Sequence, residues 1–253
     1  MLFSHPFTAL LCGPSGSGKT TFLLKLLEKQ DVLLDGSRFK HIILVYKSSQ
    51  SLYTDLNHEA AASGARITFI PAQDSIARIR SALDQLQQQK QQGREGEKTL
   101  IIYDDLGVHL TTDLQELIEQ IFIRLSHHVG VSCIYLTQTL FDQSSARSGS
   151  FLRLLNKNAH YLILMKSPRG QGALRILLHQ CMPEKQRVRV AIQSIREVLD
   201  PAFSSVIFDW RQIVPDALRI RTNIFDPPYP RVLAFPDEVT EYIKRQPVSD
   251  FNS

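Results

Sequence analysis

The feature that most constrains the fold is a glycine-rich segment near the start of the chain, Gly13-Pro14-Ser15-Gly16-Ser17-Gly18-Lys19-Thr20. An apolar run over residues 7–12 precedes it, and apolar residues at helical spacing follow it over residues 19–29. A strand, a glycine loop and a helix in this order are the context in which G-x-x-x-x-G-K-[ST] forms a phosphate-binding loop. The alternative is a glycine-rich turn that matches the pattern by chance, and the flanking strand and helix argue against it.

The residue types of this segment suit a triphosphate. Small residues let successive backbone N–H groups turn inward around phosphates, and the helix that follows directs its positive N-terminal end at the same anion. We therefore expect residues 13–21, including Thr21, to bind ATP. Within them, Lys19 is expected to reach the β- and γ-phosphates, and the Thr20 hydroxyl to ligate Mg²⁺.

Alternation of apolar runs with amphipathic segments predicts an α/β fold. Strands are expected at residues 41–46, 66–70, 99–103, 131–136 and 161–165, and helices at residues 75–92 and 114–125. Continuously apolar strands separated by helices are typical of a mainly parallel central sheet flanked by helices. We assign residues 1–182 to this core. The proline-rich residues 183–253 are expected to form a small C-terminal extension packed on the core, with an edge strand and a disordered end.

The sequence carries no sign of export or of a membrane segment. No apolar run is long enough to span a bilayer, and the N-terminal run lacks the basic region of a signal peptide. The three cysteines, Cys12, Cys133 and Cys181, are far apart and in apolar surroundings. We interpret them as reduced core thiols of a protein that is not secreted. The histidines, including the adjacent His127 and His128, lack metal-ligand spacing, so no zinc site is expected.

The net charge of +4 is mild, but basic residues are unevenly placed. Residues 143–183 contain no Asp or Glu, and they contain Arg147, Arg153, Lys157, Lys166, Arg169 and Arg175. Such a stretch can face a polyanion such as nucleotide phosphates or a DNA backbone. A solvated basic face is the alternative.

Polar residues follow two of the expected strands. We place the strand at residues 99–103 beside the strand of the glycine loop, so that Asp104 can hold Mg²⁺ and its water shell. Asp105 is then expected to orient and deprotonate the attacking water, with capping of the next helix or turn as the alternative. Gln138 follows the strand at residues 131–136 at the same edge of a parallel sheet. It is expected to contact the γ-phosphate or the lytic water, and the alternative is an ordinary solvent-facing glutamine.

Together these motifs resemble the HerA/FtsK branch of P-loop ATPases. Within that branch the chain resembles viral genome-packaging ATPases of poxvirus type and, among these, those of Maverick/Polinton elements, adintoviruses and virophages. Asp105 stands where cellular relatives have Glu, and Thr139 where Asn is expected. The segments that carry the resemblance are GPSGSGKTT (13–21), LIIYDDLG (100–107), LSHHVGVSCIYLTQTLF (125–141), NKNAHYLILMKSPRG (156–170) and LRIRTNIF (218–225).

The resemblance implies an additional-strand, RecA-like core and an ATP-driven motor. Such a motor assembles as a homo-oligomeric ring, a pentamer or hexamer, on a capsid vertex or portal and moves double-stranded DNA into the capsid. It implies an arginine finger given to a neighbouring subunit, for which Arg169 is the first candidate, Arg147 the rival and Arg153 the third. The expected location is the host nucleus, a cytoplasmic virus factory or the virion. Alternatives are another HerA/FtsK-type DNA translocase or helicase, an ATP-switched assembly factor, and a nucleotide kinase.

Overall fold

A nine-stranded sheet organises the part of the chain that the structure describes. The computed structural model describes residues 2–36, 38–93, 96–107, 110–141, 146–168, 170–182, 184–226 and 230–245, with the backbone alone at residues 146–148 and 171. The strand order is β3-β2-β4-β5-β1-β6-β7-β8-β9. The strands are β1 (Thr8–Cys12), β2 (His41–Tyr46), β3 (Arg66–Pro71), β4 (Thr99–Asp104), β5 (Val131–Thr137), β6 (Tyr161–Met165), β7 (Ser205–Asp209), β8 (Ile220–Thr222) and β9 (Arg231–Leu233). Strands β1 to β6 run parallel, and β7 to β9 pair antiparallel.

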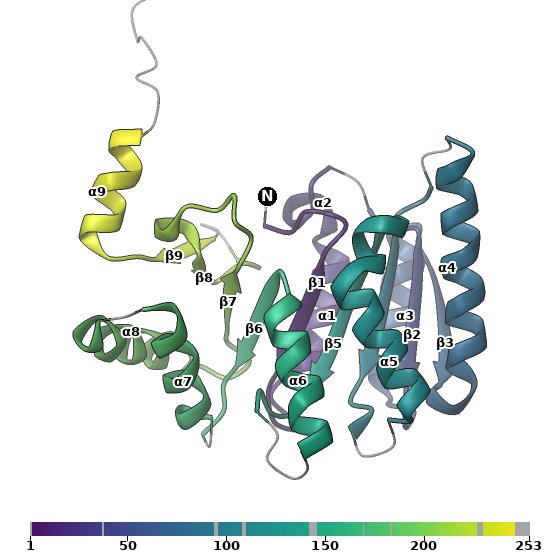
Figure 1. The fold of residues 1–253 in the computed structure, drawn as a ribbon, viewed down its shortest axis with the longest axis horizontal. Coiled ribbons are helices and arrows are strands. Elements are labelled where there is room, and N and C mark those ends of the chain that lie inside the picture. Colours follow the sequence, from purple (N-terminus) through teal and green to yellow (C-terminus); the bar gives the residue numbers. More distant parts are fainter. Residues whose placement is uncertain are drawn as a thin grey trace, which may run out of the picture.

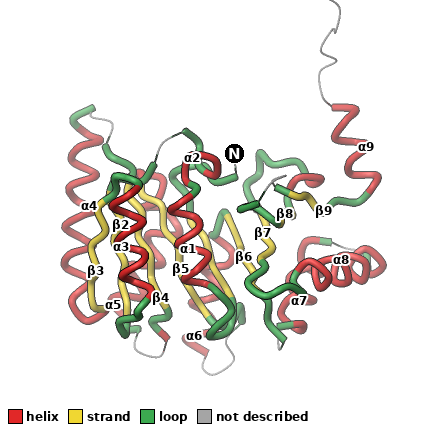
Figure 2. The backbone as a smooth tube through the Cα atoms, turned by 180° about the vertical axis from the view of Figure 1, so that it is seen from behind, coloured by secondary structure: helices red, strands yellow, loops and turns green. Residues whose placement is uncertain are grey.

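Helices cover both faces of the sheet, as Figures 1 and 2 show. Buried side chains of α1 (Lys19–Glu28), α2 (Gln30–Leu33) and α3 (Leu52–Ala62) form a core with one face. The opposite core contains buried side chains of α4 (Ser75–Gln91), α5 (Thr112–Gln120), the π-helical η3 (Ile121–Gly130), α6 (Ala146–Asn158), α7 (Gln171–Cys181) and α8 (Lys185–Val198). The short 3₁₀ turns η1 (Ala72–Asp74) and η4 (Asp216–Leu218) and the helix α9 (Pro236–Arg245) complete the described elements. The predicted α/β fold with a mainly parallel sheet is confirmed.

The placement of β4 differs in one respect from the sequence-based expectation. We expected β4 to lie beside the strand of the glycine loop, but β5 lies between them and pairs with β1 on one side and β4 on the other. All seven residues of β5 are buried, which agrees with a strand that has neighbours on both sides and helices on both faces. An inserted strand of this kind is the additional-strand arrangement.

The helix expected at residues 114–125 is longer than predicted. It begins at Thr112 and continues without a break through η3 to Gly130. The polar triplet Ser126, His127 and His128 does not end the helix, which continues to Gly130, whose φ is 81°. Glycine adopts this left-handed conformation without steric cost.

The chain after residue 182 extends the sheet by three strands rather than by the single edge strand that we expected. β7 pairs along its whole length with β6, and β8 and β9 follow it (Figure 1). Arg187 on α8 forms ion pairs with Asp237 and Glu238 at the start of α9, and its guanidinium lies 4.8 Å from the Phe235 ring centroid. Residues 246–253, for which we expected disorder, lie outside the described residues.

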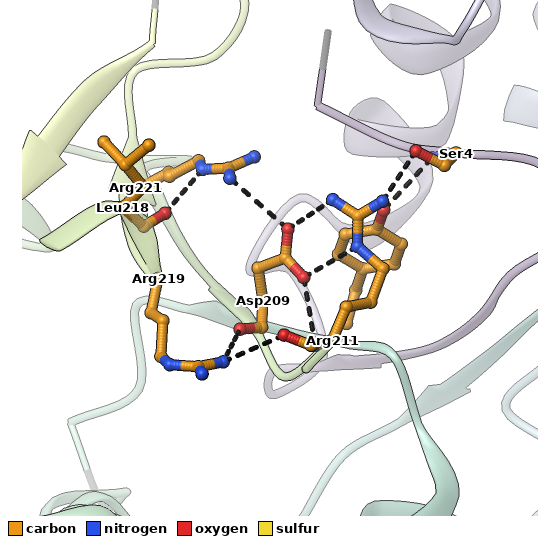
Figure 3. Close-up of polar contacts among 7 residues, drawn as sticks. Ser4, Asp209, Arg211, Leu218, Arg219 and Arg221 are labelled. Atoms are coloured by element: carbon orange, nitrogen blue, oxygen red, sulfur yellow. Dashed lines mark hydrogen bonds and ion pairs between the residues drawn. The ribbon is translucent and has the colours of Figure 1, made fainter. Parts of the chain in front are cut away.

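A buried ion cluster joins this extension to the N-terminal segment (Figure 3). Asp209, at the end of β7, has no exposed side-chain surface and pairs with Arg211 at 2.7 Å and with Arg221 at 3.4 Å. Arg211 also donates to the Ser4 hydroxyl at 2.6 Å and lies 5.0 Å from the ring centroid of Tyr161. Because Asp209 pairs in register with Tyr161, the first residue of β6, the cluster lies at the end of the strands opposite to the glycine loop.

The cysteines only partly match their expected burial. Cys12 and Cys133 are buried thiols, and burial raises the pKa of Cys12 to about 12. Cys181 is exposed near the end of α7, which corrects our expectation of three core thiols. Among the described residues, no helix combines the length and the apolar composition that a membrane crossing requires.

Candidate active site

The glycine loop joins the buried end of β1 to the start of α1. Gly16 and Gly18 have φ values of 75° and 98°, in the left-handed region where a side chain is strained. Gly13 has no room for a side chain, because an added Cβ would lie 2.5 Å from Ser17 Oγ and 2.7 Å from Met165 Cβ. The glycines of the motif therefore permit a loop that turns tightly against the end of β6.

Polar groups inside the loop fit a bound phosphate group. Lys19 is buried, and its Nζ donates to the carbonyl oxygens of Gly13 at 2.6 Å and Pro14 at 3.1 Å. Burial lowers the pKa of Lys19, against the opposing charges of Asp105 and Asp104. Ser17 Oγ is buried without a partner among the described residues. No side chain caps the N-terminus of α1, so its first N–H groups can bind an anion.

Asp104 lies at the end of β4 in a polar contact with two residues that the sequence analysis missed. Asp104 is 3% exposed, and its carboxylate accepts hydrogen bonds from Tyr53 Oη at 2.7 Å and from Gln50 Nε2 at 3.1 Å. Burial raises the pKa of Asp104, and the Tyr53 hydrogen bond opposes that shift. The signal that could have found Gln50 and Tyr53 is their position just after β2, whose last residue, Tyr46, pairs with Asp104.

The two residues expected to hold a metal converge on one side chain. Thr20 Oγ1 donates to Gln50 Oε1 at 3.4 Å, while the amide nitrogen of Gln50 donates to Asp104. The Thr20 hydroxyl and the Asp104 carboxylate thus both form hydrogen bonds with the side-chain amide of Gln50. Hydroxyl and carboxylate oxygens are ligands that Mg²⁺ accepts, so Thr20 and Asp104 fit a magnesium ion bound together with nucleotide phosphates.

Asp105 and Gln138 form a second pair beside the first. Gln138 Nε2 donates to Asp105 Oδ2 at 2.6 Å, which links the residues that follow β4 and β5. Asp105 has a left-handed φ of 44°, a conformation that Asp tolerates better than most residues. The cap of α5 is Thr111, whose side chain accepts a hydrogen bond from Leu114 N–H, so Asp105 does not cap that helix. The structure therefore brings Lys19, Asp104, Asp105 and Gln138 to one edge of the sheet.

Of the three arginine candidates, only Arg153 has a side chain among the described residues. Arg169 lies outside the described residues, as does the side chain of Arg147 on α6. Arg153 is exposed on α6. Of the other basic residues in the acid-free stretch, Lys166 pairs with Asp200 at 3.4 Å, while Lys157 and Arg175 are exposed.

Comparison with protein families matches residues 1–166 to the model described as "Poxvirus A32 protein". The match covers the glycine loop, both aspartates and Gln138. The chain belongs to the poxvirus A32 protein family.

Curated relatives of this A32-family chain include proteins named "DNA packaging protein OPG160" from variola virus and from vaccinia virus strain Copenhagen. Each is 32% identical over 145 residues, which cover 54% of this chain and 48% of the relative. A monkeypox virus protein of the same name matches at the same identity, over 43% of its length. The chain thus spans about half the length of the curated relatives that it matches.

Solved structures show the same fold for the A32-family chain. The cytoplasmic domain of the type VII secretion ATPase EccC from Thermomonospora curvata superposes with a TM-score of 0.56 at 15% identity, over 90% of this chain and 25% of that one. EssC (ATPases 2 and 3) from Geobacillus thermodenitrificans gives a TM-score of 0.52 at 14% identity, over 94% of this chain and 42% of that one. At this identity the likeness shows a P-loop ATPase fold and nothing beyond the fold.

Proposed function

We propose that this A32-family chain is an ATP-driven translocase that packages double-stranded viral DNA into a preformed capsid. The observation that carries the proposal is the convergence of Lys19, Asp104, Asp105 and Gln138 at the mouth of the glycine loop. This arrangement provides a phosphate anchor, a metal ligand and a carboxylate held by a neutral amide. The packaging role is inferred from the family and from the name of its curated relatives.

In this proposal the chain's own residues divide the chemistry of hydrolysis. Lys19 and the backbone N–H groups of the loop bind the phosphates. Thr20 and Asp104 would hold Mg²⁺, and this ion would offset charge on the transferred phosphoryl group. Asp105 accepts the proton of the attacking water and Gln138 orients that water. The Asp105–Gln138 hydrogen bond supports these roles because the two side chains are in direct contact and could both reach one water molecule.

The remaining parts of the proposal concern assembly. We infer a homo-oligomeric ring, pentameric or hexameric, in which Arg169 of one subunit approaches the phosphates bound by its neighbour, with Arg147 as the rival. The capsid vertex or portal is the proposed partner, and the host nucleus or a virus factory the proposed location. The closer likeness to Maverick/Polinton, adintovirus and virophage ATPases stays a prediction.

The test combines ATPase assays with and without double-stranded DNA and the mass of the protein in solution. A translocase should form a ring, and DNA should stimulate its turnover. A monomer whose turnover ignores DNA would instead indicate a nucleotide kinase, and a ring without sustained hydrolysis would indicate an assembly factor. A ring whose turnover DNA stimulates, but which does not move DNA into capsids, would favour another HerA/FtsK-type translocase or helicase.

A further inference from the structure

We propose that Phe203 is the stacking platform for the base of the bound nucleotide; this inference rests on the proposed ATP site. Phe203 lies between α8 and β7, in a part of the chain to which the sequence analysis assigned no role. Phe203 is 62% exposed, so this large apolar residue keeps much of its surface open to solvent.

The position of this ring follows from the topology of the sheet. Ser205, the first residue of β7, pairs antiparallel with Met165, the last residue of β6. The residues just before β7 therefore lie at the edge where the parallel strands end, which is the edge of the glycine loop. The Lys166–Asp200 ion pair also holds these residues to the end of β6.

The contact with the loop is close and specific. A Cβ added to Gly18 would lie 2.6 Å from Cδ1 of Phe203, so the ring occupies the space beside the last glycine of the motif. Phe203 has a φ of 61°, which is a steric outlier for an aromatic residue. Backbone strain of this kind tends to occur at ligand-binding sites, because the surrounding structure must maintain it.

The direction of a bound triphosphate puts its base on the same side. Asp104, Asp105 and Gln138 follow β4 and β5, on one side of β1, and mark the γ-phosphate end. The nucleoside end must then leave the loop on the other side of β1, towards β6 and β7. An exposed aromatic ring at that point offers a flat apolar face to the purine.

Stacking on a ring recognises the π-face of a base and not its hydrogen-bonding edge. Phe203 should therefore strengthen the binding of ATP and GTP to similar extents, and it should not affect the binding of a ligand without a base. This difference separates a stacking platform from a residue that only supports the glycine loop.

The experiment measures, by calorimetry with Mg²⁺ present, the affinities of the wild type, Phe203→Ala and Phe203→Tyr for ATP and for inorganic tripolyphosphate. Phe203→Ala should weaken ATP binding about tenfold or more and leave tripolyphosphate binding unchanged, while Phe203→Tyr should keep both affinities. Ile213→Ala is the matched control, because Ile213 is 84% exposed and lies between β7 and β8, at the opposite edge.

A second measurement reports the contact directly. In a Trp210→Phe background, which removes the only tryptophan of the chain, Phe203→Trp places a fluorophore at the platform. ATP should change its emission, and tripolyphosphate should not.

Two results would overturn this inference and leave the proposed ATP site intact. In one, Phe203→Ala lowers the affinities for ATP and for tripolyphosphate equally, and in the other it lowers neither affinity. An emission change of equal size with both ligands would also count against it. A wild-type protein that binds neither ligand would overturn the proposed ATP site together with the platform.

Discussion

Gln138 donates a hydrogen bond of 2.6 Å from Nε2 to Oδ2 of Asp105, and this bond joins the residues that follow two neighbouring strands. It directs one oxygen of Asp105 towards a neutral donor rather than towards a cation. A carboxylate in this environment can accept a proton from water. We therefore expect the pair to act in the hydrolysis step and not in nucleotide binding.

Asp105→Asn should keep ATP affinity and slow hydrolysis by about 10²- to 10⁴-fold, because the amide cannot accept a proton from water. Single-turnover hydrolysis and equilibrium binding measured on the same preparation separate the two effects. Asp113→Asn, an exposed change in the first turn of α5, is the matched control. Turnover that survives in Asp105→Asn would place the general base elsewhere.

Lys19→Ala should lower the affinity for ATP by at least about one to two orders of magnitude, because a charge-assisted contact to the phosphates disappears. Titration with ATP measures the loss. Lys25→Ala, on an exposed position of the same helix, should bind as the wild type does. Unchanged affinity in Lys19→Ala would refute the phosphate site.

Tyr53→Phe should shift the acid limb of the pH–activity profile to higher pH. Burial raises the pKa of Asp104, and the Tyr53 hydrogen bond lowers it, so removal of the donor raises this pKa further. The carboxylate must be ionised to ligate Mg²⁺, and it would be protonated at a higher pH than in the wild type. ATPase profiles of Tyr53→Phe and of the control Tyr242→Phe on α9 test this. A uniform loss at every pH would argue for a purely structural role of Tyr53.

Asp209→Ala should destabilise the fold without affecting ATP binding. The substitution leaves the buried Arg221 and the mostly buried Arg211 without their carboxylate, and loss of one partner of a buried ion pair typically costs about 3–5 kcal/mol. Urea unfolding measures this cost. Asp216→Ala removes the more exposed Arg219 pair and should cost about 1 kcal/mol or less. Equal costs for the two variants would show that the buried cluster adds no particular stability.

Arg169→Ala tests the proposed contact between subunits. If Arg169 completes the site of a neighbouring subunit, mixing the variant with wild type should lower ATPase activity more than in proportion to the fraction mixed. Arg80→Ala, at an exposed position of α4 and outside the three candidates, serves as the control. A linear decrease with mixing would argue against Arg169 as an arginine finger.

The sequence predicted the parts of the site that depend on local chain geometry. Gly13, Gly18 and Lys19 act within one continuous segment, so the motif and its flanking elements were enough to predict a phosphate loop. The apolar strand before Asp104 likewise predicted a buried strand that ends in carboxylates. These features needed no knowledge of which strands are neighbours.

The partners of those residues could not be predicted in the same way. Gln50 and Tyr53 reach Asp104 from a segment about fifty positions away, and their spacing carries no recognised motif. The insertion of β5 between β1 and β4 follows from competition among strands that are all apolar, which periodicity cannot resolve. Sequence alone therefore left Gln50 and Tyr53, the hydrogen-bond partners of Asp104, unassigned.

The amino-acid sequence determined the phosphate loop, the carboxylates and the α/β class, because glycine flexibility, strand burial and helix periodicity are local properties. Only the tertiary structure decided which side chains surround them: the antiparallel pairing of β7 with β6 brings Phe203 to Gly18, about 185 positions away in the chain. The physical reason is that strand order and direction depend on packing the whole sheet between two helical layers. No short segment contains that information.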